Sequence, residues 1–221
     1  MSQRLILWRH GQTAWNKERR FQGHADVPLT DVGVEQARAA AQVLATLKPN
    51  AIVSSDLQRA HVTAQMLSAL IGHEITTDVR LRETDVGEWS GKTIPEMQAE
   101  DPIRLAQWED GSDVPAGGAE TRTQVANRME LALLEHIARI PSDGVLVAVT
   151  HGGAARAAIG RLLGLEVSQW PILGGLDNCA WSVLERVKRH DGQERWRLSE
   201  HNAGTLSGPV LDDDPGPSTA W

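Results

Sequence analysis

Residues 5–16 read LILWRHGQTAWN, in which four apolar residues run directly into an arginine, a histidine and a glycine. A short uninterrupted apolar run predicts a strand that is buried on both faces of a sheet. Such strands are typical of parallel α/β sheets, where ligands gather beyond the carboxyl ends of the strands. We therefore expect residues 5–8 to place Arg9 and His10 at a ligand site.

The rest of the chain repeats this alternation of strand and helix. Apolar runs at residues 51–53 and 145–149 predict two more buried strands. Apolar residues at steps of three and four predict helices after Thr30, from Ser55 as N-cap to Gly72, and over 121–138. Residues 178–187 and 194–200 predict a final strand pair around the turn Asp191-Gly192. The expected fold is an α/β three-layer sandwich, with a mostly parallel central sheet and helices on both faces.

Two segments are less regular than the rest. Residues 84–119 contain GEWSGK, DGSD and VPAGGA, which predicts a loop-rich insertion with one or two short helices that acts as a lid. Residues 204–221 are rich in Gly, Pro, Ser and Asp and predict a flexible tail. We therefore expect a single domain over residues 1–203.

Composition narrows the classes of partner. The chain has 221 residues, 41% of them hydrophobic, and a formal net charge of -7, which argues against a nucleic-acid-binding surface. The single cysteine, Cys179, permits no internal disulfide, and the first apolar run is too short for a secretory core or a membrane span. A cytoplasmic enzyme with a small-molecule substrate and no membrane or nucleic-acid partner is expected. The oligomeric state stays open between a monomer and a homodimer.

Basic residues follow three of the predicted strands. Arg9 and His10 end the first, Arg59 lies one turn into the helix after the second, and His151 follows the third. Guanidinium groups present a planar fork of donors that suits phosphoryl oxygens, and helix starts such as that at Gly152 add backbone N–H groups. Positive surroundings keep an imidazole neutral and nucleophilic. The pattern predicts transfer of a phosphoryl group to a histidine.

A leaving alkoxide also needs a proton donor. Glu83 in the segment RLRETDVGEW is the leading candidate, and Asp85 and Glu88 are nearby alternatives. Burial would favour the protonated acid, whereas the arginines would favour the carboxylate, and the sequence leaves that balance open.

Five ordered segments, RHGQTAWN, FQGHADVPLTDVGVEQA, SSDLQRAHVTAQ, LRETDVGEWSGKT and VTHGG, resemble the histidine phosphatase (phosphoglycerate mutase-like) superfamily. The resemblance implies His10 as the phosphorylated nucleophile and Glu83 as the proton donor, without a metal or organic cofactor. The remaining implied phosphate and substrate ligands, some of them also catalytic, are Arg9, Asn16, Gln22, Gly23, Arg59, His151 and Gly152.

Segments outside the catalytic motifs bear on the subgroup. The residues after Glu83 look like the phosphatase branch, and WPILGGLDNCAWSVL (170–184) resembles glucosyl-3-phosphoglycerate phosphatases of actinobacteria. Three alternatives remain: a cofactor-dependent phosphoglycerate mutase, a broad-specificity or α-ribazole phosphatase, and a non-catalytic module that binds phosphorylated ligands. Ala119 interrupts the segment that precedes the third helix in the family. The sequence therefore leaves open where Glu120 and Thr121 lie relative to the site.

Overall fold

The computed structural model describes residues 2–188, 190 and 192–205. Within them the strands form a six-stranded sheet in the order β3-β2-β4-β1-β5-β6. β1 to β4 are mutually parallel where they pair, and β5 is antiparallel to both of its neighbours, β1 and β6. The strands span Arg4–Arg9 (β1), Ala51–Ser54 (β2), Ile75–Thr77 (β3), Val145–Thr150 (β4), Trp181–Lys188 (β5) and Glu194–Ala203 (β6). The expected mostly parallel sheet is confirmed.

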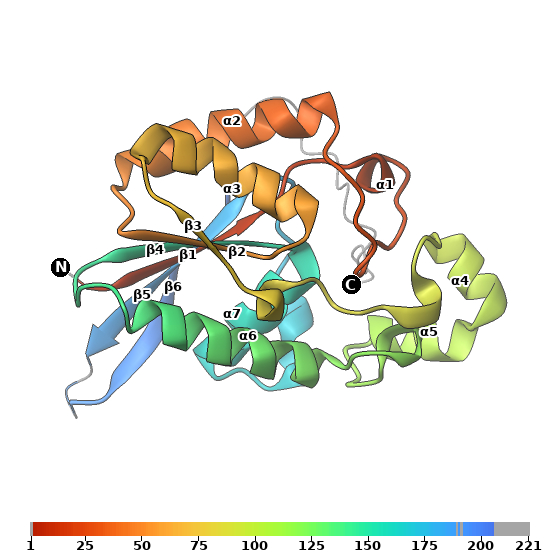
Figure 1. Cartoon of the computed structure of the whole chain (residues 1–221). Helices are drawn as coiled ribbons and strands as arrows, with labels where there is room; N and C mark the ends of the chain where they lie inside the picture. Colours follow the sequence, from red (N-terminus) through yellow and green to blue (C-terminus); the bar gives the residue numbers. More distant parts are fainter. Residues whose placement is uncertain (1, 189, 191, 206–221) are drawn as a thin grey trace.

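Helices cover both faces of this sheet (Figure 1). Side chains of successive strand residues point to opposite faces, so Leu5 and Leu7 pack under α6 and α7, while Ile6 and Trp8 pack under α2 and α3. This double burial explains the uninterrupted apolar run of β1. Trp8 is fully buried, and its Nε1 donates to the carbonyl of Cys179 at 3.1 Å.

Helix boundaries follow the predicted caps, with one exception. Outside residues 84–119, the described helices are α1 (Ala14–Lys17), α2 (Asp31–Thr46), α3 (Gln58–Ile71), α6 (Arg122–Ile137) and α7 (Gly152–Leu163), with short 3₁₀ turns at Val79–Leu81 and Val167–Ile172. Thr30 caps α2 and Gly72 ends α3, as expected. The expectation that Ser55 caps α3 is wrong, because α3 begins at Gln58 and the Gln58 N–H donates to Asp26 from another loop.

The last two strands form an antiparallel pair as expected, but β5 starts later than residue 178. Cys179 has a left-handed φ of 60°, and its N–H donates to the carbonyl of His10 at 3.2 Å. The chain therefore turns over the end of β1 before it enters β5 at Trp181. Of the predicted turn, Asp191 lies outside the described residues, and Gly192 has a φ of 80°.

Residues 84–119 form an excursion beside the sheet (Figure 1). It holds α4 (Ile94–Glu100), α5 (Pro102–Glu109) and 3₁₀ turns at Gly87–Trp89 and Ala116–Gly118, so the expected short helices are present. The excursion has its own small core, which includes Phe21, Trp89, Met97 and Leu105. No described helix is long and apolar enough to cross a membrane. The predicted tail lies outside the described residues, apart from 204 and 205.

Candidate active site

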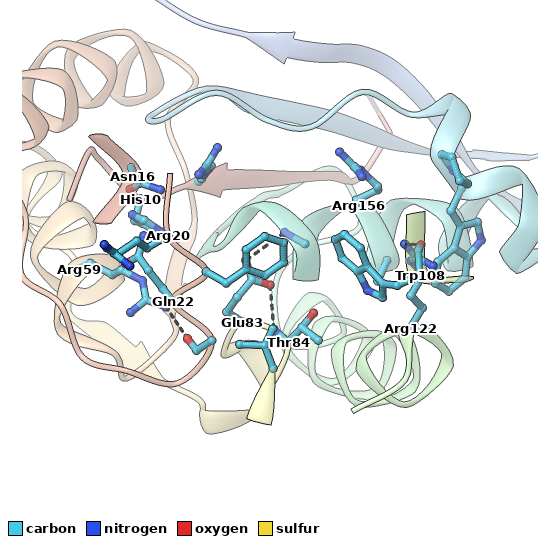
Figure 2. A pocket seen from close by; sticks show the side chains of 18 residues that line it. His10, Asn16, Arg20, Gln22, Arg59, Glu83, Thr84, Trp108, Arg122 and Arg156 are labelled. Atoms are coloured by element: carbon cyan, nitrogen blue, oxygen red, sulfur yellow. Dashed lines mark hydrogen bonds between the residues drawn. The ribbon is translucent and has the colours of Figure 1, made fainter. Parts of the chain in front are cut away.

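Most of the predicted site residues line one cavity beyond the carboxyl ends of β1 and β2 (Figure 2). The predicted residues in its wall are Arg9, His10, Asn16, Gln22, Gly23, Arg59 and Glu83. His151 and Gly152 are buried and do not belong to the wall within the described chain. His151 nevertheless adjoins the cavity, because its ring lies edge-on to that of His10 with 5.1 Å between the centroids.

The hydrogen bond of His10 defines which of its nitrogens carries the proton. Its Nδ1 lies 2.7 Å from the carbonyl oxygen of Gly11, which can only accept. Nδ1 is therefore protonated, and a neutral ring presents the lone pair of Nε2. Burial, together with the nearby guanidinium groups of Arg59 and Arg9, holds the pKa of His10 well below 6.5. His10 is thus a neutral imidazole at neutral pH, with a free lone pair on Nε2.

His151 has the opposite tautomer. Its Nδ1 accepts a hydrogen bond from Nε of Arg59 at 3.2 Å, since a guanidinium N–H can only donate. Burial, and then the charge of Arg59, holds the pKa of His151 well below 6.5, so the ring is neutral and its proton sits on Nε2. That buried Nε2 has no hydrogen-bond partner within the described chain. His151 therefore offers one unused donor.

Two guanidinium groups supply positive charge to the cavity. Arg59 is fully buried, and its terminal nitrogens donate to the carbonyls of Ala25 at 2.6 Å and Gly23 at 2.8 Å. Burial lowers the pKa of Arg59 to about 10, so it stays charged at neutral pH. Arg9 donates to the carbonyl of Leu176, and its buried Nε has no hydrogen-bond partner among the described residues. Both arginines can donate to an anion.

Amide side chains complete this end of the cavity. Oδ1 of Asn16 accepts from the backbone N–H of Thr13, which commits its Nδ2 group to act as a donor elsewhere. Asn178, which the sequence did not single out, donates to the carbonyl of His10 at 3.1 Å and to Asn16 at 3.3 Å. The buried Oε1 of Gln22 has no partner within the described residues. Gln22 is therefore a polar wall residue that remains free to contact a ligand.

Glu83 lies against the start of α7. Its two oxygens accept backbone N–H groups from Gly153 at 3.0 Å and Ala154 at 2.8 Å, and a third bond comes from Thr84. The carboxylate thereby caps the first turn of α7, where backbone N–H groups lack helical partners. A Cβ built on Gly153 would lie 2.8 Å from Oε1 of Glu83, so the contact depends on this glycine.

The other acidic candidates serve different roles. Asp85 accepts the N–H of Gly87 through its side chain, and Glu88 lies within a 3₁₀ turn. Glu120, whose place the sequence left open, pairs with Arg128 at 2.8 Å, and Thr121 caps α6. Of these acids, Glu83 is the one in the cavity wall.

The far end of the cavity holds two arginines, Arg122 and Arg156, that the sequence did not single out. Figure 2 places Arg156, Trp108 and Arg122 on the side of Glu83 away from His10. Arg156 lies three residues after Gly153 on α7, a spacing that puts both on one helix face and could have suggested it. Trp108 and Arg122 reach the cavity through the packing of residues 84–119, for which the sequence carries no local signal.

Comparison with known proteins places this geometry in a family. A sequence profile of the histidine phosphatase superfamily (branch 1) matches residues 5–203. The chain is 42% identical to a glucosyl-3-phosphoglycerate phosphatase of Mycolicibacterium vanbaalenii over 90% of this chain and 94% of the relative. It is 34% identical to a probable phosphoglycerate mutase GpmB of Yersinia pestis, over 95% of this chain and 97% of that protein. The chain belongs to the histidine phosphatase superfamily.

The structural comparison agrees. A mycobacterial glucosyl-3-phosphoglycerate phosphatase, solved in complex with VO₃, superposes with a TM-score of 0.84 and 41% identity, covering 91% of this chain and 99% of the other. The fold expectation is therefore confirmed, and so is the resemblance. The chain is a phosphatase of this superfamily, and the mutase alternative is less favoured.

Proposed function

We propose that the chain hydrolyses a small phosphate monoester, glucosyl-3-phosphoglycerate or a close relative, through a phosphohistidine at His10. The observation that carries the proposal is the pair of tautomers: His10 presents an Nε2 lone pair, and His151 presents an Nε2 proton. The first is a nucleophile and the second is a donor for a phosphoryl oxygen. The names of the relatives supply the substrate class.

In the first step, Nε2 of His10 forms a bond to phosphorus while the bond to the ester oxygen breaks. Arg9, Arg59 and His151 Nε2–H donate to the phosphoryl oxygens, and Asn16 Nδ2 is a further donor. Catalysis then rests on position and charge compensation. Glu83, entering this step protonated, gives its proton to the leaving oxygen, and the alcohol departs. Nδ1 of His10 keeps its proton and its bond to the carbonyl of Gly11.

In the second step, the carboxylate of Glu83 takes a proton from a water molecule whose oxygen attacks phosphorus. The phosphorus–nitrogen bond of His10 breaks, its electron pair returns to Nε2, and inorganic phosphate leaves. The deprotonated Glu83 of this step is the form whose oxygens accept the N–H groups of Gly153 and Ala154. The proton that Glu83 gains prepares it for the next turnover.

The test is phosphate release from glucosyl-3-phosphoglycerate, phosphoglycerates, sugar phosphates and nucleotides, with a metal chelator present. All charge compensation in this scheme comes from side chains, so we expect full activity with the chelator and none with His10→Ala. Adding 3-phosphoglycerate with the bisphosphorylated primer separates hydrolysis from transfer. Formation of 2-phosphoglycerate in place of phosphate would favour the mutase alternative, and tight binding without any turnover would favour a binding module.

A further inference from the structure

The end of the cavity away from His10 carries two arginines that have no carboxylate partner. In the described chain, neither Arg122 nor Arg156 forms an ion pair, and the buried Nε of Arg156 has no hydrogen-bond partner. Arg20, in the same cavity wall, differs because it pairs with Glu18 and Glu96. Buried or half-buried cations without a counter-charge are costly, which points to an anionic occupant.

The position of Arg122 is fixed by its own contacts. Its guanidinium lies over the ring of Trp108, 4.8 Å from the centroid, and donates to the backbone carbonyls of Trp108 and Ser112. The carboxylate of Asp113 interacts electrostatically with Arg122 but forms no ion pair with it in the described chain. Asp113 accepts a hydrogen bond from the backbone N–H of Thr123. Arg122 is therefore a preorganised cation, held by groups that do not neutralise its charge.

The spacing along α7 relates this pair to the reacting atoms. Gly153 donates to Glu83, the proposed acid beside the ester oxygen, and Arg156 lies one turn further along the same helix. Three residues of α-helix correspond to a rise of roughly 4.5 Å. If the ester oxygen of the substrate lies beside Glu83, a second anionic group of the same substrate can contact Arg156 only when a few bonds separate it from that oxygen. A carboxylate on the three-carbon unit of a phosphoglycerate meets this requirement, and a planar guanidinium suits it.

We propose that Arg156 and Arg122 form a carboxylate subsite that selects phosphate esters of hydroxy acids over esters of neutral alcohols. This inference rests on the proposed function, because it takes the phosphoryl group to lie at His10 and the ester oxygen near Glu83. The arginines determine specificity and take no part in the transfer of the phosphoryl group.

The test compares 3-phosphoglycerate with glycerol 3-phosphate, which share the phosphate and the carbon chain and differ in the carboxylate. For Arg156→Gln we expect kcat/KM for 3-phosphoglycerate to fall by about 30-fold and that for glycerol 3-phosphate to change by less than about threefold. Arg156→Lys should recover part of the loss. Arg122→Gln should act in the same direction, with thermal unfolding checking that loss of its carbonyl contacts leaves the fold intact.

The matched control is Arg161→Gln, which lies on the same helix and pairs with Glu130 outside this cavity. It should leave the ratio of the two kcat/KM values unchanged. An equal fall for both substrates in Arg156→Gln, or an unchanged ratio, would overturn the carboxylate subsite while leaving the phosphatase proposal intact. Turnover that survives His10→Ala would instead overturn the proposed mechanism.

Discussion

Nε of Arg59 donates to Nδ1 of His151 at 3.2 Å. This hydrogen bond links the start of α3, the helix that follows β2, to the residue that follows β4. It fixes the His151 tautomer so that Nε2–H points away from Arg59. The same guanidinium holds the carbonyls of Gly23 and Ala25. Arg59 therefore shapes the end of the cavity that holds His10 and also supplies positive charge there.

Replacing Arg59 by lysine separates charge from geometry. A lysine keeps the positive charge but loses the planar fork that bonds three acceptors at once. We expect Arg59→Lys to lower kcat/KM by about 100-fold, the size of effect that misplaced groups produce. Steady-state kinetics measures it, with Arg38→Lys on the exposed face of α2 as the control. Activity close to wild type would mean that charge alone suffices.

The two buried imidazoles make stability depend on pH. Burial holds the pKa of His10 and His151 below 6.5 in the folded chain, so below about pH 6.5 the unfolded chain binds more protons. As the pH is lowered from about 6.5, the free energy of unfolding should therefore fall by about 1.4 kcal/mol per pH unit for each histidine. This loss ends when the pH reaches the pKa of that histidine in the folded chain.

Urea unfolding at several pH values between about 7.5 and 5.5 measures that slope. His151→Gln should reduce the slope by the share of one histidine, whereas the same change at the exposed His73 should not. A slope that His151→Gln leaves unchanged would show that the buried imidazole already carries its charge in the folded state.

Gly153 tests the placement of Glu83. In Gly153→Ala the new Cβ would lie 2.8 Å from Oε1 of Glu83, which must move away from α7. We expect kcat to fall by about 10- to 100-fold. Thermal stability should hold, because alanine is favoured over glycine in a helix by about 1 kcal/mol. Gly174→Ala, whose Cβ would meet only a ring nitrogen at 4.0 Å, is the matched control.

Arg128 holds the segment that carries Glu83. Its terminal nitrogens donate to the carbonyls of Arg80, Arg82 and Glu83 at 2.7 to 2.8 Å, and it also pairs with Glu120. We expect Arg128→Met to lower the free energy of unfolding by about 2–3 kcal/mol, because three carbonyls lose a charged donor. Arg161→Met, which breaks a half-exposed pair, should cost less than about 1 kcal/mol. Equal effects in urea unfolding would contradict this role.

The fold and the grouping of Arg9, His10, Arg59 and His151 could be predicted because their signals are local. The apolar run before Arg9 marks a strand buried on both faces, and parallel strands share one carboxyl edge, which brings His10 and His151 together. The start of α2 at Thr30 and the end of α3 at Gly72 are likewise set by neighbouring residues. Such features need no knowledge of how distant segments pack.

The remaining features depend on contacts between distant segments. Gln58 is capped by Asp26 rather than by Ser55, and Glu83 meets the backbone of Gly153, 70 positions later. Trp108 reaches the cavity through the packing of the excursion at residues 84–119. None of these pairings has a periodic or short-range signature, so sequence patterns alone could not have found them.

The central claim is that phosphorus bonds to His10, and trapping that intermediate tests it most directly. The full chain is mixed with 3-phosphoglycerate or glucosyl-3-phosphoglycerate, quenched within one turnover in base, where phosphohistidine survives, and digested for mass spectrometry. We predict one added phosphoryl group on the peptide that contains His10, at Nε2, and no adduct in His10→Ala. Product formation in the first turnover without any adduct, or an adduct on a different residue, would contradict the claim.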